Sequence, residues 1–289
     1  MGDIILSALT EGVFWSIVAI GLYISFRILH LSDMTTEGSF PLGACLAIVS
    51  ILNDLSPLMA LVVSFIGGAL AGLVTGVLIN RLRIPNLLAG ILTMSAFYSI
   101  NLKIMQRSNL NILGKNTLVN YITHQSNVLP YAYLWLGSLM VALLLTALYF
   151  FFKTEVGQAL IASGDNAEMA MSSGIPVERM KILGLMLANG IIAFGGGLLA
   201  QKGNFADVNM GIGVIVVALA SIIIGEVIFP YVTFGQRLIC IVLGSIIYRF
   251  LLASVISLKV ISANDFKLFS ALLIAVCLAL PLIREKIHR

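Results

Sequence analysis

The stretch Gly164–Lys181, GDNAEMAMSSGIPVERMK, stays polar in the middle of a chain that is otherwise close to continuously apolar. Of the 289 residues, 60% are hydrophobic and only 10% are charged, and the mean hydropathy is +1.05. Soluble domains carry about 25% charged and about 45–50% apolar residues, so this composition indicates a protein of the lipid bilayer. The polar stretch therefore has to be a connection between membrane spans.

The apolar runs predict an all-α, polytopic membrane bundle of about 8–10 transmembrane helices, since a span needs roughly 20 apolar residues. Helices satisfy their own backbone amides in hydrocarbon, and the runs lack the alternation of a membrane β-barrel. The expected spans are residues 4–26, 38–53, 57–79, 87–104, 131–152, 178–200, 212–228, 235–256 and 267–283. They form a single transmembrane domain, 1–289, without an appended enzyme or nucleotide-binding domain, so any energy source lies on another chain.

Lys and Arg residues set the orientation, because cytoplasmic loops near span ends carry the excess of positive charge. Placing the C-terminus in the cytoplasm puts ten basic residues inside, namely Arg27, Arg81, Arg83, Lys153, Arg179, Lys181, Arg237, Arg284, Lys286 and Arg289. Six fall outside, namely Lys103, Arg107, Lys115, Lys202, Lys259 and Lys267. The polar stretch is then cytoplasmic, and an odd number of spans places the N-terminus outside. The net charge of +4 comes from basic residues between the apolar runs, so it reflects the orientation in the membrane and does not indicate binding to nucleic acid.

The connections and cysteines suit the same class of protein. Residues 106–130 are rich in Asn and Thr and contain His124, which fits an external loop over the outer mouth as well as a plain connector. The start, MGDIILSALTEG, lacks the basic region and cleavage site of a signal peptide, so we expect it to begin the first span. Cys45, Cys240 and Cys277 lie inside apolar runs without CxxC spacing, so we expect structural cysteines and no metal site.

Small residues recur at the spacing of helix-packing motifs. Gly68, Gly72 and Gly76 form two overlapping GxxxG patterns, and Gly190 precedes three consecutive glycines at 195–197. Such faces let membrane helices approach closely, so they predict a compact bundle, although they indicate no particular function. A sequence repeat at half length, found in many secondary transporters, is not evident.

The polar stretch carries the signals of a short helix between two turns. Asp165 or Asn166 can cap its start, and Gly174 can end it in a left-handed conformation. Pro176 with Glu178 suits the first turn of the following span. We therefore expect helix, turn and helix in this order.

Within that short helix, Ala167, Ala170 and Met171 share one small apolar face at i, i+3, i+4 spacing, bounded by polar side chains. An isolated helix of this length is marginal in water, so a partner must order it, either its own bundle or a cytoplasmic protein. The sequence thus predicts a stiff knob within a cytoplasmic segment, 153–178.

GDNAEMAMSSGIPV, followed by LANGIIAFGGGLLA, resembles a pattern in the permease subunits of bacterial ATP-binding-cassette importers of the branched-chain amino acid and monosaccharide class. That pattern is of the type Gly-x-Asn-x-x-Ala-Ala-x-x-x-Gly-Ile-x-Val, followed by a glycine-rich span. SDMTTEGSFPLGA is similar to the broken second span of the family, and VVALASIIIGE to its ALAxxxxGG segment. Met169 stands where the family tends to carry an alanine, and Glu226 where it has a glycine.

The resemblance implies a transport subunit and not an enzyme, with the polar stretch docked on a separate ATPase. The residues that it implies for this coupling are Gly164, Asp165, Asn166, Ala167, Glu168, Ala170, Met171, Gly174 and Ile175. ATP and Mg²⁺ would bind to the ATPase, and no cofactor to this chain. The other implied partners are an extracytoplasmic substrate-binding protein, a second permease copy in a homodimer or heterodimer, and the bilayer of a bacterial inner membrane.

Polar groups inside the spans are candidates for a translocation path, because an ionisable residue at the bilayer centre costs at least about 2.5–3.5 kcal/mol. Glu37 lies in TTEGSFPLG, where Pro41 removes a backbone donor and glycines relax the helix. We therefore expect a broken span that presents Thr35, Thr36 and Ser39 to a wet cavity. Equally, Glu37 could be a first-turn acid at the cytoplasmic interface. The candidate path residues are Thr36, Glu37, Ser39, Thr93, Tyr98 and Asn189.

Other polar residues in the spans have structural alternatives. Asn189 and Asn101 are as typical of hydrogen bonds between helices as of a conduit. Glu226 and Arg249 could pair with each other, or Arg249 could reach the outer headgroups. For Glu226 and Arg249 we favour a structural role over contact with substrate.

The cargo that the resemblance favours is an amino acid, aromatic or otherwise hydrophobic, while sugars, nucleosides and vitamins remain open. An ion-coupled secondary transporter is the alternative mechanism, and it predicts charged residues near the midplane, where only the Glu37 region qualifies. The sequence contains no HExxH, no GxSxG and no paired carboxylates within spans, which disfavours an intramembrane enzyme.

Overall fold

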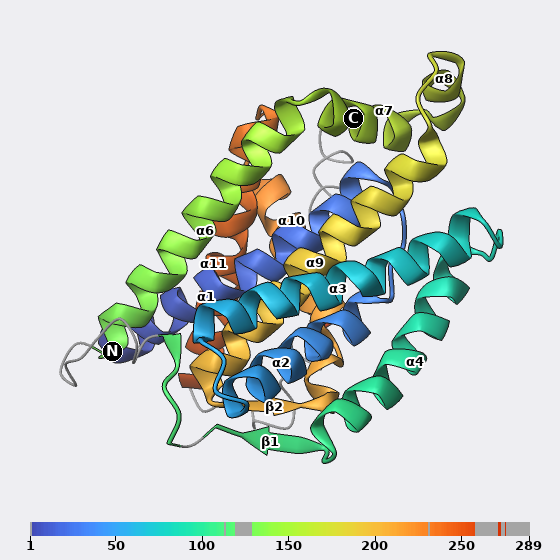
Figure 1. Ribbon diagram of the computed structural model, residues 1–289. Helices are drawn as coiled ribbons and strands as arrows, with labels where there is room; N and C mark the ends of the chain where they lie inside the picture. Colours follow the sequence, from blue (N-terminus) through green and yellow to red (C-terminus); the bar gives the residue numbers. More distant parts are fainter. Residues whose placement is uncertain are drawn as a thin grey trace.

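The computed structural model describes residues 2–112, 114–118, 129–230, 232–257, 271–272 and 275, and this part of the chain is almost entirely helical (Figure 1). The long helices are α1 Gly2–Tyr23, α3 Pro57–Asn80, α4 Asn86–Met105, α6 Leu129–Lys153, α9 Val177–Gly203 and α11 Phe234–Ser257. The shorter ones are the π-helix η1 Ile24–Ile28, α2 Thr36–Leu52, α7 Glu155–Asp165, α8 Ala167–Ser172, the 3₁₀ helix η2 Val208–Gly211 and α10 Val214–Ile228. Two strands, β1 Asn109–Asn111 and β2 Phe205–Asp207, pair antiparallel.

The membrane spans follow the predicted order. Within the described residues, seven helical segments are long and apolar enough to cross a membrane, and α2 is a shorter apolar helix of 17 residues. These eight segments lie where the sequence predicts the first eight spans, with boundaries that differ by a few residues. The ninth expected span, 267–283, lies almost entirely outside the described residues. The predicted fold class, an all-α membrane bundle, is confirmed.

The bundle has two polar ends, here called the α8 end and the sheet end. α7 and α8 lie at one, and the β1–β2 pair and the beginning of α1 lie at the other (Figure 1). Most basic residues predicted inside belong to helix termini and turns of the α8 end, namely Arg27, Arg81, Arg83, Lys153, Arg179, Lys181 and Arg237. The predicted arrangement, with the first span starting opposite the polar stretch, is confirmed.

Helices in the core touch through glycines. α3 and α9 run antiparallel, and a Cβ atom at Gly72 would clash with the carbonyl oxygen of Leu185. A Cβ at Gly68 would likewise clash with the backbone of Asn189, one turn further along α9. The close packing that the GxxxG patterns predict is therefore confirmed.

α2 begins inside the bundle and not at its end. Ser39 in its first turn bonds to Asn189, which lies about 18 Å along α9 from the start of that helix at the α8 end. The expected interruption of the second span is present, but Pro41 does not cause it, because this residue lies within α2 and the helix continues beyond it. The break is the turn 29–35 that precedes α2.

α10 also begins at membrane depth. Residues 204–213 fold back from the sheet end so that η2 packs on α2, and the N–H of Gly213 donates to the carboxylate of Glu37 at 3.0 Å. Gly213 has a φ of +86°, a left-handed conformation that glycine adopts without strain. The beginnings of α2 and α10 thus meet inside the bundle, where they position the candidate site.

Candidate functional site

A cavity of about 280 Å³ lies where α2, α4 and η2 meet. Its wall includes α4 residues from Met94 to Asn101, roughly 12–22 Å from the α8 end of a helix about 30 Å long, so the cavity lies within the depth of this span. Its size is close to the lower end of the range for ligand pockets, about 300–1,000 Å³. The lining residues are Glu37, Gly38, Pro41, Met94, Ser95, Tyr98, Asn101, Val208, Asn209 and Ile212.

Glu37 is the acidic residue of this cavity. One carboxylate oxygen accepts the N–H of Gly213 at 3.0 Å, and the side chain is half-buried. Glu37 lies in the first turn of α2, as expected of a first-turn acid, but that turn begins inside the bundle and not at the interface. The structure therefore places Glu37 beside a cavity and not at the α8 end.

Three polar residues of α4 line the same cavity. Asn101 is fully buried, and its Nδ2 donates to the carbonyl of Gly38 at 3.5 Å, whereas its Oδ1 has no hydrogen-bond partner among the described residues. Ser95 and Tyr98 are exposed on the open side. Of the predicted path residues, the cavity thus brings together Glu37 and Tyr98.

The remaining predicted path residues are held in buried hydrogen bonds. Asn189 donates to the carboxylate of Asp33 at 2.6 Å and accepts the hydroxyl of Ser39 at 2.7 Å. Thr36 donates to the carbonyl of Asp33 at 3.2 Å. Asn189 therefore takes the structural alternative that the sequence left open, a hydrogen bond between elements.

Thr93 belongs to a second buried polar group. Its hydroxyl accepts from Thr75 at 3.0 Å, and the Thr75 hydroxyl lies 2.7 Å from that of Thr35. These residues come from α4, α3 and the turn 29–35, and none is more than 2% exposed. The group ties the turn to two helices.

Sequence reasoning misses Asp33 and Thr75. It expects Thr35 to face a wet cavity, whereas Thr35 is fully buried and bonds to Thr75. Asp33 is 5% exposed, and its Oδ1 accepts the N–H of Thr35 at 2.9 Å, which is the hydrogen bond of an Asx turn. An Asp two residues before a Thr is a local signal for such a turn, but nothing in the sequence indicates that the turn is buried. Thr75 has no distinguishing signal, because a hydroxyl in an apolar helix usually bonds to the preceding turn, as it also does here.

The polar stretch forms α7, α8 and the turn into α9. Asn166, and not Asp165, caps α8, since its side-chain oxygen accepts the N–H of Met169 at 3.0 Å. Gly174 has a φ of +83° and ends the segment in the left-handed conformation that the sequence predicts. Pro176 is the N-cap of α9. The prediction of helix, turn and helix is confirmed.

The apolar face predicted on α8 is divided between the bundle and the outside. Ala170 is only 3% exposed and packs inward, and Ala167 is half-buried. Met171 is 57% exposed, and Met169 beside it is 68% exposed. α8 is therefore anchored through Ala170, and its accessible apolar surface consists of the two methionines.

Gly164 connects the polar stretch to the rest of the bundle. α7 passes so close to η1 that a Cβ at Gly164 would clash with the carbonyl oxygen of Ile28. Nearby, Nε2 of His30 lies 3.9 Å from the carboxylate of Asp165. η1 is followed by the turn 29–35 and then by α2, so α7 contacts the segment that leads to the cavity.

Glu226 and Arg249 do not pair with each other. Glu226 at the end of α10 forms an ion pair with Arg27 of η1, at the α8 end. Arg249 lies further along α11, where its Cζ is 4.3 Å from the centroid of the Trp15 ring. The predicted alternative of a Glu226–Arg249 pair is wrong, because the two residues lie at different depths.

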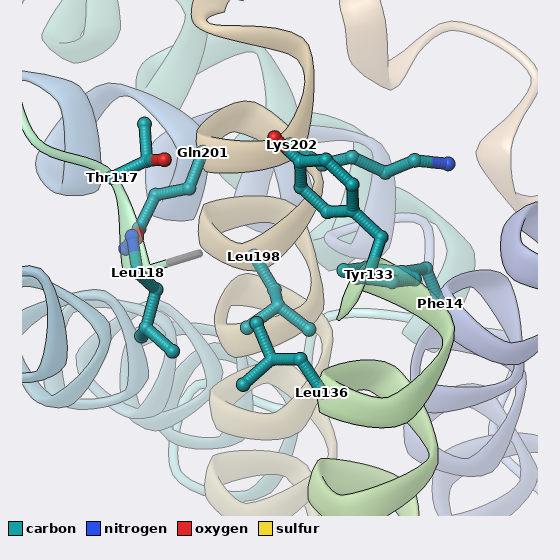
Figure 2. A pocket seen from close by; sticks show the side chains of 8 residues that line it. All are labelled: Phe14, Thr117, Leu118, Tyr133, Leu136, Leu198, Gln201 and Lys202. Carbon is teal, nitrogen blue, oxygen red and sulfur yellow. The ribbon is translucent and has the colours of Figure 1, made fainter. Parts of the chain in front are cut away.

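A second, much smaller cavity lies at the sheet end (Figure 2). Its volume of about 10 Å³ has room for one water molecule. Gln201 points toward Thr117 and Leu118 in Figure 2; its Oε1 accepts the N–H of Leu118 at 3.2 Å, and its Nε2 donates to the carbonyl of Pro57 at 3.0 Å. Gln201 thus holds part of the predicted external loop against α9, although residues 113 and 119–128 of that loop lie outside the described residues.

Comparison with known proteins agrees with this architecture. Residues 4–278 match the family described as branched-chain amino acid transport system / permease component. A tyrosine transport system permease protein of Clostridioides difficile (strain R20291) is 41% identical over 95% of this chain and 90% of that protein. An inner membrane ABC transporter permease protein, YjfF of Escherichia coli (strain K12), is 26% identical over 77% of this chain and 67% of that protein.

Among solved structures, a chain of PsaBC from Streptococcus pneumoniae in complex with Fab has a TM-score of 0.53 at 12% identity. The match covers 96% of this chain and 90% of that chain, and at this identity it shows similarity of fold alone. The family match and the relatives carry the assignment. The chain belongs to the branched-chain amino acid transport system permease family, the permease subunits of ATP-binding-cassette importers.

Proposed function

We propose that this chain moves an amino acid, in particular an aromatic one such as tyrosine, across a bacterial inner membrane as the permease of an ATP-driven importer. The tyrosine transport permease that is 41% identical over 95% of this chain supports the cargo class. The observation that carries the path is the cavity of α2, α4 and η2, where Glu37 and four uncharged polar side chains gather inside an apolar bundle. A membrane protein places such groups at depth where solutes or water pass.

The open side of the cavity supports a second permease copy. Ser95, Tyr98 and Asn209 are exposed there, at membrane depth. Polar side chains are unfavourable against lipid tails, so they suit a protein partner or an aqueous path. In this proposal two copies, identical or closely related, face each other across the path.

α8 supports a contact with an ATPase subunit. The Asn166 cap and the buried Ala170 fix the helix on the bundle, so that Met169 and Met171 project from the α8 end. Methionine side chains adapt well to an apolar docking groove. ATP and Mg²⁺ bind to the ATPase in this proposal, and an extracytoplasmic binding protein delivers the substrate at the sheet end.

The mechanism that these contacts support is alternating access. Nucleotide binding draws two ATPases together, and the α8 helices move with them. The contact of Gly164 with Ile28 passes the displacement to the turn 29–35. Because Asp33 and Thr35 bind that turn to the neighbouring helices, α2 and the cavity change together.

Replacing Met171 with Arg tests the docking role of α8. Met171 is 57% exposed, so the fold tolerates the charge, but an apolar interface would have to desolvate it. We expect co-purification with the cognate ATPase to fall roughly tenfold or more. ATP-dependent tyrosine uptake in proteoliposomes with the ATPase and binding protein should fall with it.

Leu55→Arg is the matched control, since Leu55 is an apolar residue that is 46% exposed at the opposite end of the bundle. This variant should retain the ATPase. Ala170→Arg would not test docking, because Ala170 is buried and an arginine at this position would disturb the fold. Normal uptake by Met171→Arg would contradict the role of α8, and uptake by the chain alone under an ion gradient would favour the ion-coupled alternative.

A further inference from the structure

The cavity of α2, α4 and η2 has two hydrogen-bond acceptors without donors. One carboxylate oxygen of Glu37 is occupied by the N–H of Gly213, and the other has no protein partner among the described residues. Oδ1 of the fully buried Asn101 is also without a partner in this part of the chain. Both residues line the same cavity, and the amide nitrogen of Asn101 bonds to the carbonyl of Gly38, the residue after Glu37.

Basic side chains do not supply the missing donors. The described residues that line the cavity include no Lys, Arg or His. In the described part of the chain, Arg27, Lys115 and Lys202 form ion pairs with other acids. A carboxylate at membrane depth is costly when it is unpaired, so a cation that enters from outside the chain would be stabilised beside Glu37.

The rest of the lining is arranged for an amphiphilic molecule. Met94 and Ile212 provide apolar walls, whereas Ser95, Tyr98 and Asn209, which can donate hydrogen bonds, are exposed at the open rim. The two acceptors without donors therefore lie deeper than the exposed side chains at the mouth, which can donate. This order matches a molecule with a cationic end, an apolar body and an anionic end that stays near the rim.

We propose that Glu37 and Asn101 form the subsite that receives the ammonium group of the transported amino acid. The inference rests on the proposed function and adds which end of the cargo this chain recognises. The ammonium group donates to both free acceptors, and the carboxylate of the amino acid points toward the rim. A sugar brings no cation to Glu37, so the same cavity disfavours it.

Three probes that share a phenol ring test the subsite on the unchanged full chain in lipid nanodiscs. Tyramine has the ammonium group alone, 3-(4-hydroxyphenyl)propionate has the carboxylate alone, and L-tyrosine has both. Equilibrium binding should be saturable for tyramine and L-tyrosine. The propionate should bind roughly tenfold more weakly or worse, because it leaves Glu37 and Asn101 unpaired.

Two variants locate the effect. Glu37→Gln removes the charge but keeps an oxygen for the N–H of Gly213, so the contact with α10 survives and tyramine affinity should fall roughly tenfold or more. Asn101→Leu removes the second acceptor at similar size and should also weaken tyramine. Asp54→Asn is the control, because Asp54 is an exposed acid at the sheet end.

The subsite is refuted by any of three results: equal binding of tyramine and the propionate, tyramine affinity within about twofold of the unchanged chain in both variants, or no saturable tyramine binding up to about 10 mM. ATP-dependent uptake by the complete transporter tests the proposed function separately. Retained uptake together with one of these results refutes the subsite alone. Uptake that needs no ATPase refutes the importer even if tyramine binds.

Discussion

The carboxylate of Asp33 depends on two neighbours for its place inside the bundle. It accepts the N–H of Thr35 at 2.9 Å and the side-chain amide of Asn189 at 2.6 Å, and Asp33 is only 5% exposed. A buried acid is tolerated when such hydrogen bonds replace its water. Since Asp33 lies in the turn 29–35, these few polar groups decide where α2 begins.

Replacing Asn189 with Leu should therefore destabilise the bundle. The change removes the donor to Asp33 and the acceptor of Ser39, and losing a hydrogen bond to a charged group costs about 1.5–3 kcal/mol. Ser39→Ala loses only a bond between neutral groups and should cost about 0.5–1.5 kcal/mol. Unfolding by denaturing detergent measures both, and an Asn189→Leu protein as stable as the unchanged chain would show that Asp33 does not need this partner.

At the scale of elements, the spans and the presence of an interruption in the second span could be predicted, but the position of that interruption could not. Apolar runs identify the helices because every backbone amide in hydrocarbon needs an internal partner. Pro41 indicated a break inside the second span, yet a proline in the first turns of a helix removes few hydrogen bonds, and α2 continues through it. The actual break, 29–35, is held by side chains of α3 and α9 that are distant in sequence.

The same division applies to the candidate site. Glu37 and Tyr98 could be predicted because a polar residue in an apolar run stands out. Asn209 and Ile212 could not, because residues 204–213 read as a plain connection and reach the cavity only by folding back against α2. The orphan acceptor of Asn101 likewise depends on a neighbour, Gly38, from another helix.

Glycine contacts between helices lead to a prediction with a matched pair. A Cβ at Gly43 would clash with the backbone of Ala193, which cannot move without shifting α9, whereas a Cβ at Gly67 would meet only the flexible end of Leu46. Gly43→Ala should cost about 1–3 kcal/mol, while Gly67→Ala should cost less because Leu46 can change its rotamer. Thermal unfolding of the two variants in the same detergent compares them, and equal losses would contradict the backbone contact between α2 and α9.

Over the whole molecule, the knob and the cavity lie at different depths and are joined by one continuous segment. α7 touches η1 at Ile28, η1 runs into the turn 29–35, and that turn ends where α2 begins beside the cavity. η1 is a π-helix, a form that is frequent at functional sites because it interrupts the regular hydrogen-bond ladder. A displacement of α8 therefore has a short route to Glu37 through packed backbone.

Gly164→Ala tests this route without altering either end of it. The new methyl group would clash with the carbonyl oxygen of Ile28 and push α7 away from η1, while Met169 and Met171 remain free to bind the ATPase. We expect normal co-purification with the ATPase and continued ATP hydrolysis, but fewer substrate molecules moved per ATP. Overpacking of about 1–3 kcal/mol is enough to change the population of a two-state element severalfold.

Gly184→Ala is the control for that experiment. A Cβ at Gly184 would meet Cδ1 of Leu29 at 2.6 Å, and Leu29 belongs to the same segment as Ile28. The end of the Leu29 side chain can move aside, whereas the backbone carbonyl of Ile28 cannot. Its ratio of transport to hydrolysis should stay close to that of the unchanged chain. If Gly164→Ala kept a normal ratio while its α7 was displaced, the signal from the ATPase would have to enter through α9, the other helix that continues directly from the polar stretch. On that route the displacement would reach Asp33 through the hydrogen bond that Asn189 donates, so Asn189→Leu should lower the ratio of transport to hydrolysis more than Gly164→Ala does.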